Sequence, residues 1–294
     1  AIEPYHDRVR ESVEGRIAAG SRRDLHARIA YALEAAGEPR DPQLLLRNFQ
    51  LAEVGDRAAR YAEEAALRSE AAHAFDQAAE LWRIALDAIP REPADRSAML
   101  LRLGRALVSA GRGADAAKQY LAAAEGVDRA TRLECHRNAA EQLVISGHIG
   151  PGIAALESVL AEIGVSAPKT PRKMLLSLLW HRAQVRVRGL GFRERHRREI
   201  ADATRLELEV LKVAAYSLSM IDVLRGMDFQ TRHLLMALRI GDREHVVRAV
   251  LLQAIHLATA SDQKRAQQYI ERAIAITDPN DPLTAAMVPG VRSA

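Results

Sequence analysis

The chain has 294 residues, of which 48% are hydrophobic and 27% charged, a composition typical of a soluble protein that can fold. Aromatic residues account for only 4%, which favours close packing of alanine-rich helices and argues against a β-rich core. The net charge of +4 is unevenly spread, because residues 169–198 hold ten Lys or Arg against Glu194 alone, a local balance of +9 that leaves −5 for the remainder. The overall charge therefore does not indicate nucleic-acid binding.

Cys135 is the single cysteine, so no internal disulfide can form, and no apolar run approaches the roughly 18 residues that a membrane span needs. Both features predict a cytoplasmic protein. Neither a Met nor the apolar segment of a signal peptide stands at Ala1, and the sequence stops at Ala294 soon after a new helix is expected to start at Asp281. We therefore expect a piece of a longer protein.

Residues 1–56 are predicted to form paired helices. One helix is expected over residues 5–19 and a second over residues 22–36, capped by Ser21 and ended by Gly37. A third start is predicted where Pro42 follows Asp41, because aspartate caps a helix and proline suits its first turn. The pair Gly55-Asp56 separates that helix from the next.

One string in this first part, with apolar and small positions behind it, stands just ahead of repeats: Tyr5, His6, Asp7, Arg8, Val9, Arg10, Glu11, Leu25, His26, Ile29 and Ala30. It resembles the junction at which signal-transduction ATPases of the STAND class pass from their nucleotide-binding and winged-helix part into helical repeats. The resemblance implies that residues 1–56 are the end of such a module. A surface cap at His6-Asp7 is the alternative explanation.

A repeat organises residues 57–166. Its small, large and helix-ending positions occur twice with the same spacing: Ala78, Trp82, Ala85 and Pro90, then Ala116, Tyr120, Ala123 and Asp128. A first helix and its turn precede the second copy: Leu100, Leu103, Gly104, Leu107 and Gly111. The pattern resembles the tetratricopeptide repeat (TPR), a helical hairpin of about 34 residues that needs neighbours to bury its apolar face. An alanine-rich bundle with accidental periodicity is the alternative.

The repeat also predicts how its hairpins pack. Gly104 and Ala116 should let two helices approach closely, and the ring of Trp82 or Tyr120 should fill the gap to the next hairpin. A third, degenerate copy fits residues 133–166. The pattern indicates a binding scaffold, without indicating what is bound.

Residues 167–201 form a basic joint after a proline-containing break. Its arginines are Arg182, Arg186, Arg188, Arg193, Arg195, Arg197 and Arg198. Met174, Leu175, Leu178, Leu179 and Val185 can lie along one side of a helix flanked by Lys173, Arg182 and Arg186, an arrangement typical of an interfacial helix on anionic lipid. Contact with nucleic acid is a further alternative, although single-strand binders interleave more aromatic residues than Phe192. We favour a joint whose apolar side packs between two repeat arrays while its arginines lie in water or pair with acidic residues.

Residues 202–294 are predicted to form a second, truncated array. Helices are expected over residues 202–224 and 229–240 with Gly226 as the turn, and a last repeat fits residues 247–280. The whole chain is therefore predicted to be all-α, a right-handed α-α superhelix of about a dozen helices in two arrays.

A second set of residues follows the proline-containing break and the arginine-rich segment: Asp222, Arg225, Gly226, Phe229, Gln230, Arg232, Leu234, Leu235, Ala237, Leu238, Gly241, Arg248 and Ala249. This set resembles the helical region of large bacterial serine/threonine kinases that also contain a STAND ATPase. The resemblance implies a non-catalytic sensor and scaffold that binds a protein or peptide, including other domains of its parent protein. The alternative is a stand-alone, effector-binding regulator that contacts nucleic acid or a membrane surface through the basic joint.

The sequence lacks the residues that phosphoryl chemistry requires. No glycine precedes a lysine as in a P-loop, and the nearest kinase-like strings, at residues 136–138 and 228–230, miss the catalytic and metal-binding aspartates. Cys135 and His136 are neighbours that point about 100° apart on a helix, so they form no catalytic dyad. Five further histidines lack a three- or four-residue spacing: His181, His196, His233, His245 and His256. We predict no enzyme activity, metal site or cofactor.

The repeat resemblance also implies which side chains face a partner, because the first helix of each hairpin lines the inner surface. The positions implied are Arg60, Glu63, Glu64, Arg105, Glu134, Arg137, Asn138 and Glu141. Similar repeats that clamp a terminal carboxylate use Lys and Asn at fixed inner positions, and this chain offers Asn138 alone in that pattern. We therefore expect a partner segment with alternating charge.

Overall fold

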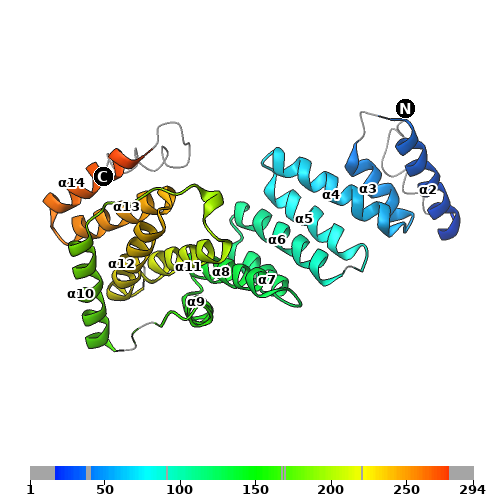
Figure 1. Ribbon diagram of the computed structural model, residues 1–294. Coiled ribbons are helices and arrows are strands. Elements are labelled where there is room, and N and C mark those ends of the chain that lie inside the picture. The colour runs from blue at the N-terminus through cyan, green and yellow to red at the C-terminus, as the bar shows by residue number, and fades with distance from the viewer. Residues whose placement is uncertain are drawn as a thin grey trace. The chain divides into compact units, whose positions relative to one another are not determined.

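The computed structural model describes residues 17–37, 41–90, 92–166, 168, 170–219 and 221–277. These residues form thirteen α-helices and one short 3-10 helix, and no strand occurs among them (Figure 1). The predicted all-α class is confirmed. No helix in the described ranges is both long enough and apolar enough to cross a bilayer. The chain divides into two compact units, Ala1–Asp128 and Arg129–Ala294.

The first unit contains six described helices, each packed against the next along the chain. They are α2 (Ala19–Ala35), α3 (Pro42–Leu51), α4 (Gly55–Ala71), α5 (Phe75–Asp87), α6 (Pro93–Ser109) and α7 (Gly113–Ala123). The predicted start of α3 is confirmed, because the Asp41 carboxylate accepts a hydrogen bond of 2.9 Å from the Gln43 backbone amide. The predicted Ser21 cap is wrong: the helix has begun before Ser21, and the Arg22 amide donates to the Ala18 carbonyl.

Residues 5–11, which carry the resemblance to the STAND junction, and residues 278–294 lie outside the described residues. The same limit applies to most of the helix expected over residues 5–19 and to the unfinished hairpin at Asp281.

Five turns of three residues join helices with one backbone geometry. They span residues 52–54, 72–74, 110–112, 146–148 and 260–262. In each turn the middle residue has a positive φ: Glu53, His73, Gly111, Gly147 and Ser261. The third residue donates its amide back to a carbonyl five positions earlier, which satisfies a helix end that would otherwise lack a partner. The turns recur in both units.

Small residues allow the close approach of helices that the sequence predicts. A Cβ on Gly104 would lie 2.4 Å from the ring of Tyr120, so this ring packs on α6 within its own hairpin. The ring of Trp82, on α5, reaches the next hairpin: the guanidinium of Arg102, on α6, lies 5.3 Å from its centroid. The expected gap-filling aromatic is therefore Trp82.

The second unit contains the remaining helices. They are α8 (Arg129–Ile145), α9 (Ile149–Glu162), α10 (Pro171–Arg188), the 3-10 helix η1 (Arg197–Glu199), α11 (Asp202–Ser219), α12 (Val223–Ile240), α13 (Arg243–Thr259) and α14 (Gln263–Ile276). Helix α11 packs on α12 and also on α8 and α9, whereas α10 packs on α12.

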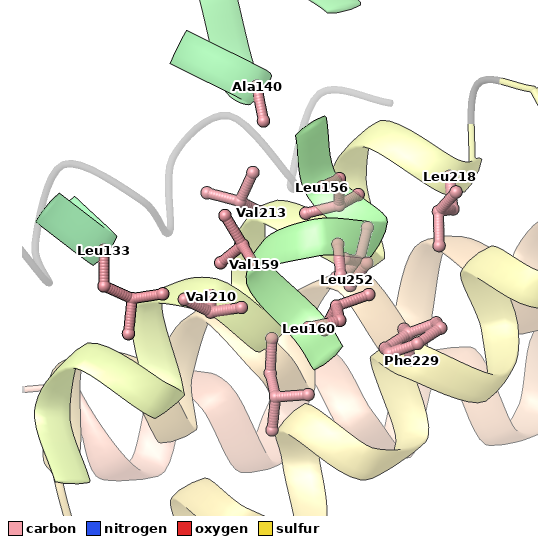
Figure 2. Close-up of a cluster of buried hydrophobic side chains, with 13 residues drawn as sticks. Leu133, Ala140, Leu156, Val159, Leu160, Val210, Val213, Leu218, Phe229 and Leu252 are labelled. Carbon is pink, nitrogen blue, oxygen red and sulfur yellow. The ribbon is translucent and has the colours of Figure 1, made fainter. Parts of the chain in front are cut away.

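An apolar cluster joins α8, α9, α11, α12 and α13 within this unit (Figure 2). Leu156, Val159 and Leu160 of α9 point among Val210 and Val213 of α11, and all five are buried. Helices on both sides of residues 167–201 therefore contribute to one core. The domain boundaries predicted after residues 56, 166 and 201 stay predictions.

The predicted turn at Gly226 is wrong, because this glycine lies inside α12. Asp222 caps the helix by accepting a hydrogen bond from the Arg225 amide. A Cβ on Gly226 would lie 2.4 Å from the Ser219 Cα atom, at the end of α11. Glycine is needed here for a close approach of two backbones, a requirement that its sequence pattern does not distinguish from a turn.

Candidate functional site

A buried carboxylate fixes α10 on α12. Asp228 of α12 has no exposed surface, and its Oδ1 atom accepts hydrogen bonds from Ser177 Oγ at 2.9 Å and His181 Nδ1 at 2.8 Å. Its Oδ2 atom lies 2.9 Å from a guanidinium nitrogen of Arg232, which also donates to Ser177 Oγ at 3.0 Å. A buried charge needs such partners. The network therefore decides which side of α10 faces the unit.

The apolar residues of α10 are divided between two sides, contrary to the single side expected from the sequence. Met174, Leu178 and Val185 are buried, whereas Leu175 and Leu179 are 47% and 53% exposed. Further apolar side chains are exposed on the same helix: Leu176, Trp180 and Val187. The helix α10 therefore has apolar groups on both sides, so hydrophobicity alone could not decide which side would pack.

The arginines of the basic joint take separate roles within the second unit. Arg182 and Arg186 line a pocket beside α14. Arg188 donates to the carbonyls of Gly191 at 2.9 Å and Leu238 at 2.8 Å, so it helps to close the end of α12.

The remaining four arginines follow α10. Arg193 and Arg195 pass close to Gly241, whose carbonyl accepts a hydrogen bond of 2.9 Å from the Arg195 amide. Arg197 and Arg198 lie in η1, and Arg197 lines a cleft against α8 and α11. The joint is therefore not one basic surface.

That cleft, here called the mixed-charge cleft, has a volume of about 920 Å³. The start of α8, the end of α9, η1 and the first half of α11 line it. Its cations are Arg129, Arg137, Arg197 and Arg205, and its anions are Glu134, Glu162, Asp202, Glu207 and Glu209. The cleft thus brings together Glu134 and Arg137 from the predicted partner surface with Arg197 from the basic joint.

Several of these charges are already paired. Arg129 lies 3.4 Å from Glu162, and Arg205 lies 3.4 Å from Asp202. In contrast, Glu134, Arg197 and Glu207 form no ion pair with any residue that the structure describes. A partner could pair with these three charges without first breaking an ion pair inside the protein.

Arg137 is a structural residue more than a contact residue. Its side chain is only 13% exposed, and its guanidinium lies 3.6 Å from Glu141 and 3.9 Å from Glu209 of α11. Asn138 and Glu141 are half-buried on the same helix. Of the four α8 residues predicted to face a partner, Glu134 is the exposed one.

In the first unit the predicted partner residues lie on α4 and α6. Arg60 and Arg105 are exposed, and Glu63 and Glu64 are half-buried. Glu64 pairs with Arg68 one turn along α4, at 2.7 Å.

A row of polar side chains runs inward from the cleft at Glu209. This carboxylate pairs with Lys212 and lies 3.2 Å from His245 Nε2, and His245 Nδ1 lies 3.0 Å from His233 Nε2. A carboxylate can only accept, so with one proton on each ring His245 donates to Glu209 and accepts from His233. His233 Nδ1 is then an acceptor, and it has no partner among the described residues.

The electrostatics of this row follow from burial. Burial alone raises the pKa of Glu209, but the His245 hydrogen bond and the Lys212 charge outweigh it and hold the pKa well below its usual range. Burial lowers the pKa of His233 well below its usual range, and the charge of Lys212 acts in the same direction. His233 is therefore neutral in the folded protein near pH 7.

Glu209, Asp202 and the contact of His233 with His245 were not predicted from the sequence. The two histidines lie on different helices joined at residues 241–242, so no spacing within one helix could reveal them. Cys135 is fully buried, in agreement with the predicted packed thiol. Within the described ranges no group of three or more His, Cys, Asp or Glu side chains could hold a metal ion.

Comparison with known proteins adds no assignment. No protein-family model matches the chain, and no curated protein matches it in sequence.

Proposed function

We propose that this chain is a non-catalytic protein-interaction and regulatory segment of a multidomain bacterial signalling protein, a serine/threonine kinase with a STAND ATPase module. Its helices would form TPR-like hairpins stacked in a right-handed superhelix. The recurring three-residue turns support this arrangement, because they repeat one hairpin geometry in both units.

The mixed-charge cleft is the observation on which the proposal mainly rests. Its lining contains nine charged side chains of both signs around a volume of about 920 Å³, whereas small-molecule pockets are mostly apolar with only a few polar groups. A segment with alternating charge complements such a surface, since each unpaired cleft charge can meet an opposite one. Another domain of the same parent protein could supply this segment.

The experiment measures binding to the remaining domains of the parent protein, produced as separate proteins. Arg197→Glu combined with Glu134→Arg reverses two exposed cleft charges while preserving the net charge. We expect binding at low salt to weaken by about tenfold, mainly through the association rate, because exposed charges steer encounter more than they slow dissociation.

The control variant is Arg172→Glu on the exposed start of α10, which leaves the cleft unchanged. Unchanged affinity of the cleft variant, together with loss of binding in the control, would reject the cleft as the partner site.

A second candidate, the regulator that contacts a membrane surface, is favoured by one observation. A shallow recess of about 480 Å³ between α10 and α12 is lined by Trp180, Val187 and Leu235, and Val187 is 90% exposed. Exposed apolar side chains beside Arg188 and Arg239, which line the same recess, match an anionic bilayer.

Cosedimentation with phosphatidylserine vesicles, compared with phosphatidylcholine vesicles, tests this candidate. Trp180 fluorescence should shift to the blue on insertion, and Val187→Glu should abolish the shift. Equal recovery of the protein with both vesicle types would reject it.

A further inference from the structure

A second pocket lies within the second unit, away from the mixed-charge cleft. It has a volume of about 420 Å³, and α10, α12, α13 and α14 line it. Ala183 and Leu257 supply apolar surface above the buried Val185 and Leu234, while the polar groups come from Thr231, Gln253, Gln268 and Tyr269. This volume is in the range of small-molecule sites, which are about 300–1,000 Å³.

The charge of this pocket has one sign. Arg182 and Arg186 enter from α10 and Arg265 enters from α14, whereas none of its lining residues in the described ranges is acidic. Arg265 is partly balanced by Asp262, 3.5 Å away at the start of α14. Arg186 forms no ion pair within the described part of the chain. The pocket therefore has cationic charge that its own walls do not neutralise.

Arg182 is the best-placed of these cations. Its side chain is half-buried, and its Nη2 atom donates a hydrogen bond of 3.5 Å to the Met227 sulfur, a weak acceptor. Its Nε atom is buried and has no acceptor among the described residues. The guanidinium of Arg182 therefore has hydrogen-bonding capacity that the described residues leave unused.

The neighbouring titratable groups respond to the same cations. Burial raises the pKa of Tyr269, and the charges of Arg265 and Arg182 oppose that rise. Burial lowers the pKa of His256, and Arg182 lowers it further. Of these two titratable groups, Tyr269 lines the pocket together with Arg182 and Arg265.

We propose that this pocket binds a small phosphate monoester. The guanidinium groups of Arg182 and Arg186 hold the phosphate, and Leu257 and Tyr269 cover the organic part. Arginine matches the phosphate oxygens through paired hydrogen bonds. A phosphate monoester near pH 7 has a charge of about −1.5 to −2, which suits two cations better than a single carboxylate does. The inference goes beyond the proposed partner cleft and does not depend on it.

The test is isothermal titration calorimetry of the full chain with phenyl phosphate as the ligand. We expect one site per chain with a dissociation constant of about 1 mM or lower. Inorganic phosphate should bind at least about tenfold more weakly because it lacks the apolar part. Benzoate tests whether any aromatic anion suffices, and benzyl alcohol tests whether the ring alone does.

Two variants locate the site. Arg182→Gln combined with Arg186→Gln should weaken phenyl phosphate binding at least about tenfold. Arg172→Gln, on the same helix but outside the pocket, should leave it unchanged. Because Arg182 also contacts the protein, a second variant avoids it: Gln268→Glu places a carboxylate in the pocket on an exposed position of α14, and Gln263→Glu is its control outside the pocket.

The proposal is overturned if phenyl phosphate fails to bind the unaltered chain below about 10 mM. It is also overturned if inorganic phosphate, benzoate or benzyl alcohol binds as tightly, or if both control variants lose affinity as much as the pocket variants. Loss of binding in Gln268→Glu with retention in Gln263→Glu supports it even where the double arginine variant does not fold.

Discussion

The two units differ in what they bury. In the described part of the first unit the buried polar residues are neutral: Asn48, Ser69 and Ser97. In the second unit the neutral Ser217, Gln230, Thr231 and Gln253 are joined by buried ionisable groups: Asp228, His233, Asp242, His245 and His256. The first unit packs alanines around rings such as Phe49 and Tyr61, which stack with centroids 5.6 Å apart.

This difference shows two ways of specifying helix packing. Alanine and aromatic positions in phase suffice where each helix meets its neighbour along the chain, as in the first unit. Helix α10 instead meets α12, about fifty residues away, and Asp228 determines the side by which it docks. Both pockets of functional interest lie in the unit that contains the ionisable groups.

The largest expected effect comes from removing the buried carboxylate. Asp228→Ala leaves Arg232 and His181 without their partner and should lower the unfolding free energy of the second unit by about 3–5 kcal/mol. Urea denaturation measures this, followed by the fluorescence of Trp82 in the first unit and Trp180 in the second. A Trp180→Phe variant isolates the Trp82 signal.

The control is Asp202→Ala, whose carboxylate side chain is 99% exposed and should contribute about 0.5 kcal/mol or less. If Asp228→Ala has no larger effect than this control, the network does not fix α10.

The next largest effect compares a buried glycine in each unit. Gly226→Ala sets a Cβ against the backbone of Ser219 and should destabilise the second unit by about 2–3 kcal/mol. Gly104→Ala meets the ring of Tyr120, which can tilt, and the better helix propensity of alanine offsets part of the strain. We expect a loss of about 1 kcal/mol or less for Gly104→Ala. Thermal unfolding measures the loss of stability in both variants. A larger loss for Gly104→Ala than for Gly226→Ala would contradict the assignment of Gly226 to a backbone contact.

A smaller effect is the pH dependence due to His233. Its pKa is depressed in the folded protein, so the unfolded chain takes up a proton below its usual pKa of 6.5 and the folded chain does not. Stability from this group is therefore complete above that pH and falls by about 1.4 kcal/mol per pH unit as the pH decreases.

His233→Leu should remove that slope between about pH 6 and pH 5, as read from urea denaturation at each pH. The matched control for losing a histidine is His73→Asn in the first unit, at a position of positive φ that asparagine tolerates. An unchanged slope in His233→Leu would show that His233 is not the group responsible.

The smallest difference is expected at the turns, where the two units are alike. Gly111 and Gly147 have positive φ, and no atom lies within 4 Å of the place that a Cβ atom would take at either position, so alanine would feel backbone strain alone. Both Gly111→Ala and Gly147→Ala should cost about 1 kcal/mol, and the two values should agree within error. Unequal values would mean that the turn geometry is not shared.

The sequence determined those parts of the fold that depend on local chemistry. Asp41 before Pro42 specified a capped helix start, and Gly111 marked a turn, because caps and left-handed turns need particular residue types. Trp82 and Gly104 indicated helix contacts through size alone. The equivalent turns at Glu53, His73 and Ser261 contain no glycine, and the break predicted at Gly55-Asp56 fell just after the first of them, because both of those residues lie in α4.

Only the tertiary structure decided which helices and charges meet. Helical periodicity gives each residue a direction around its own axis and does not name the facing helix. The contacts of Asp228 with Ser177, of His233 with His245 and of Arg188 with the end of α12 all join separate helices. For the same reason the arginines of the basic joint, one run in the sequence, are divided in the fold between a cleft, a pocket and a helix end.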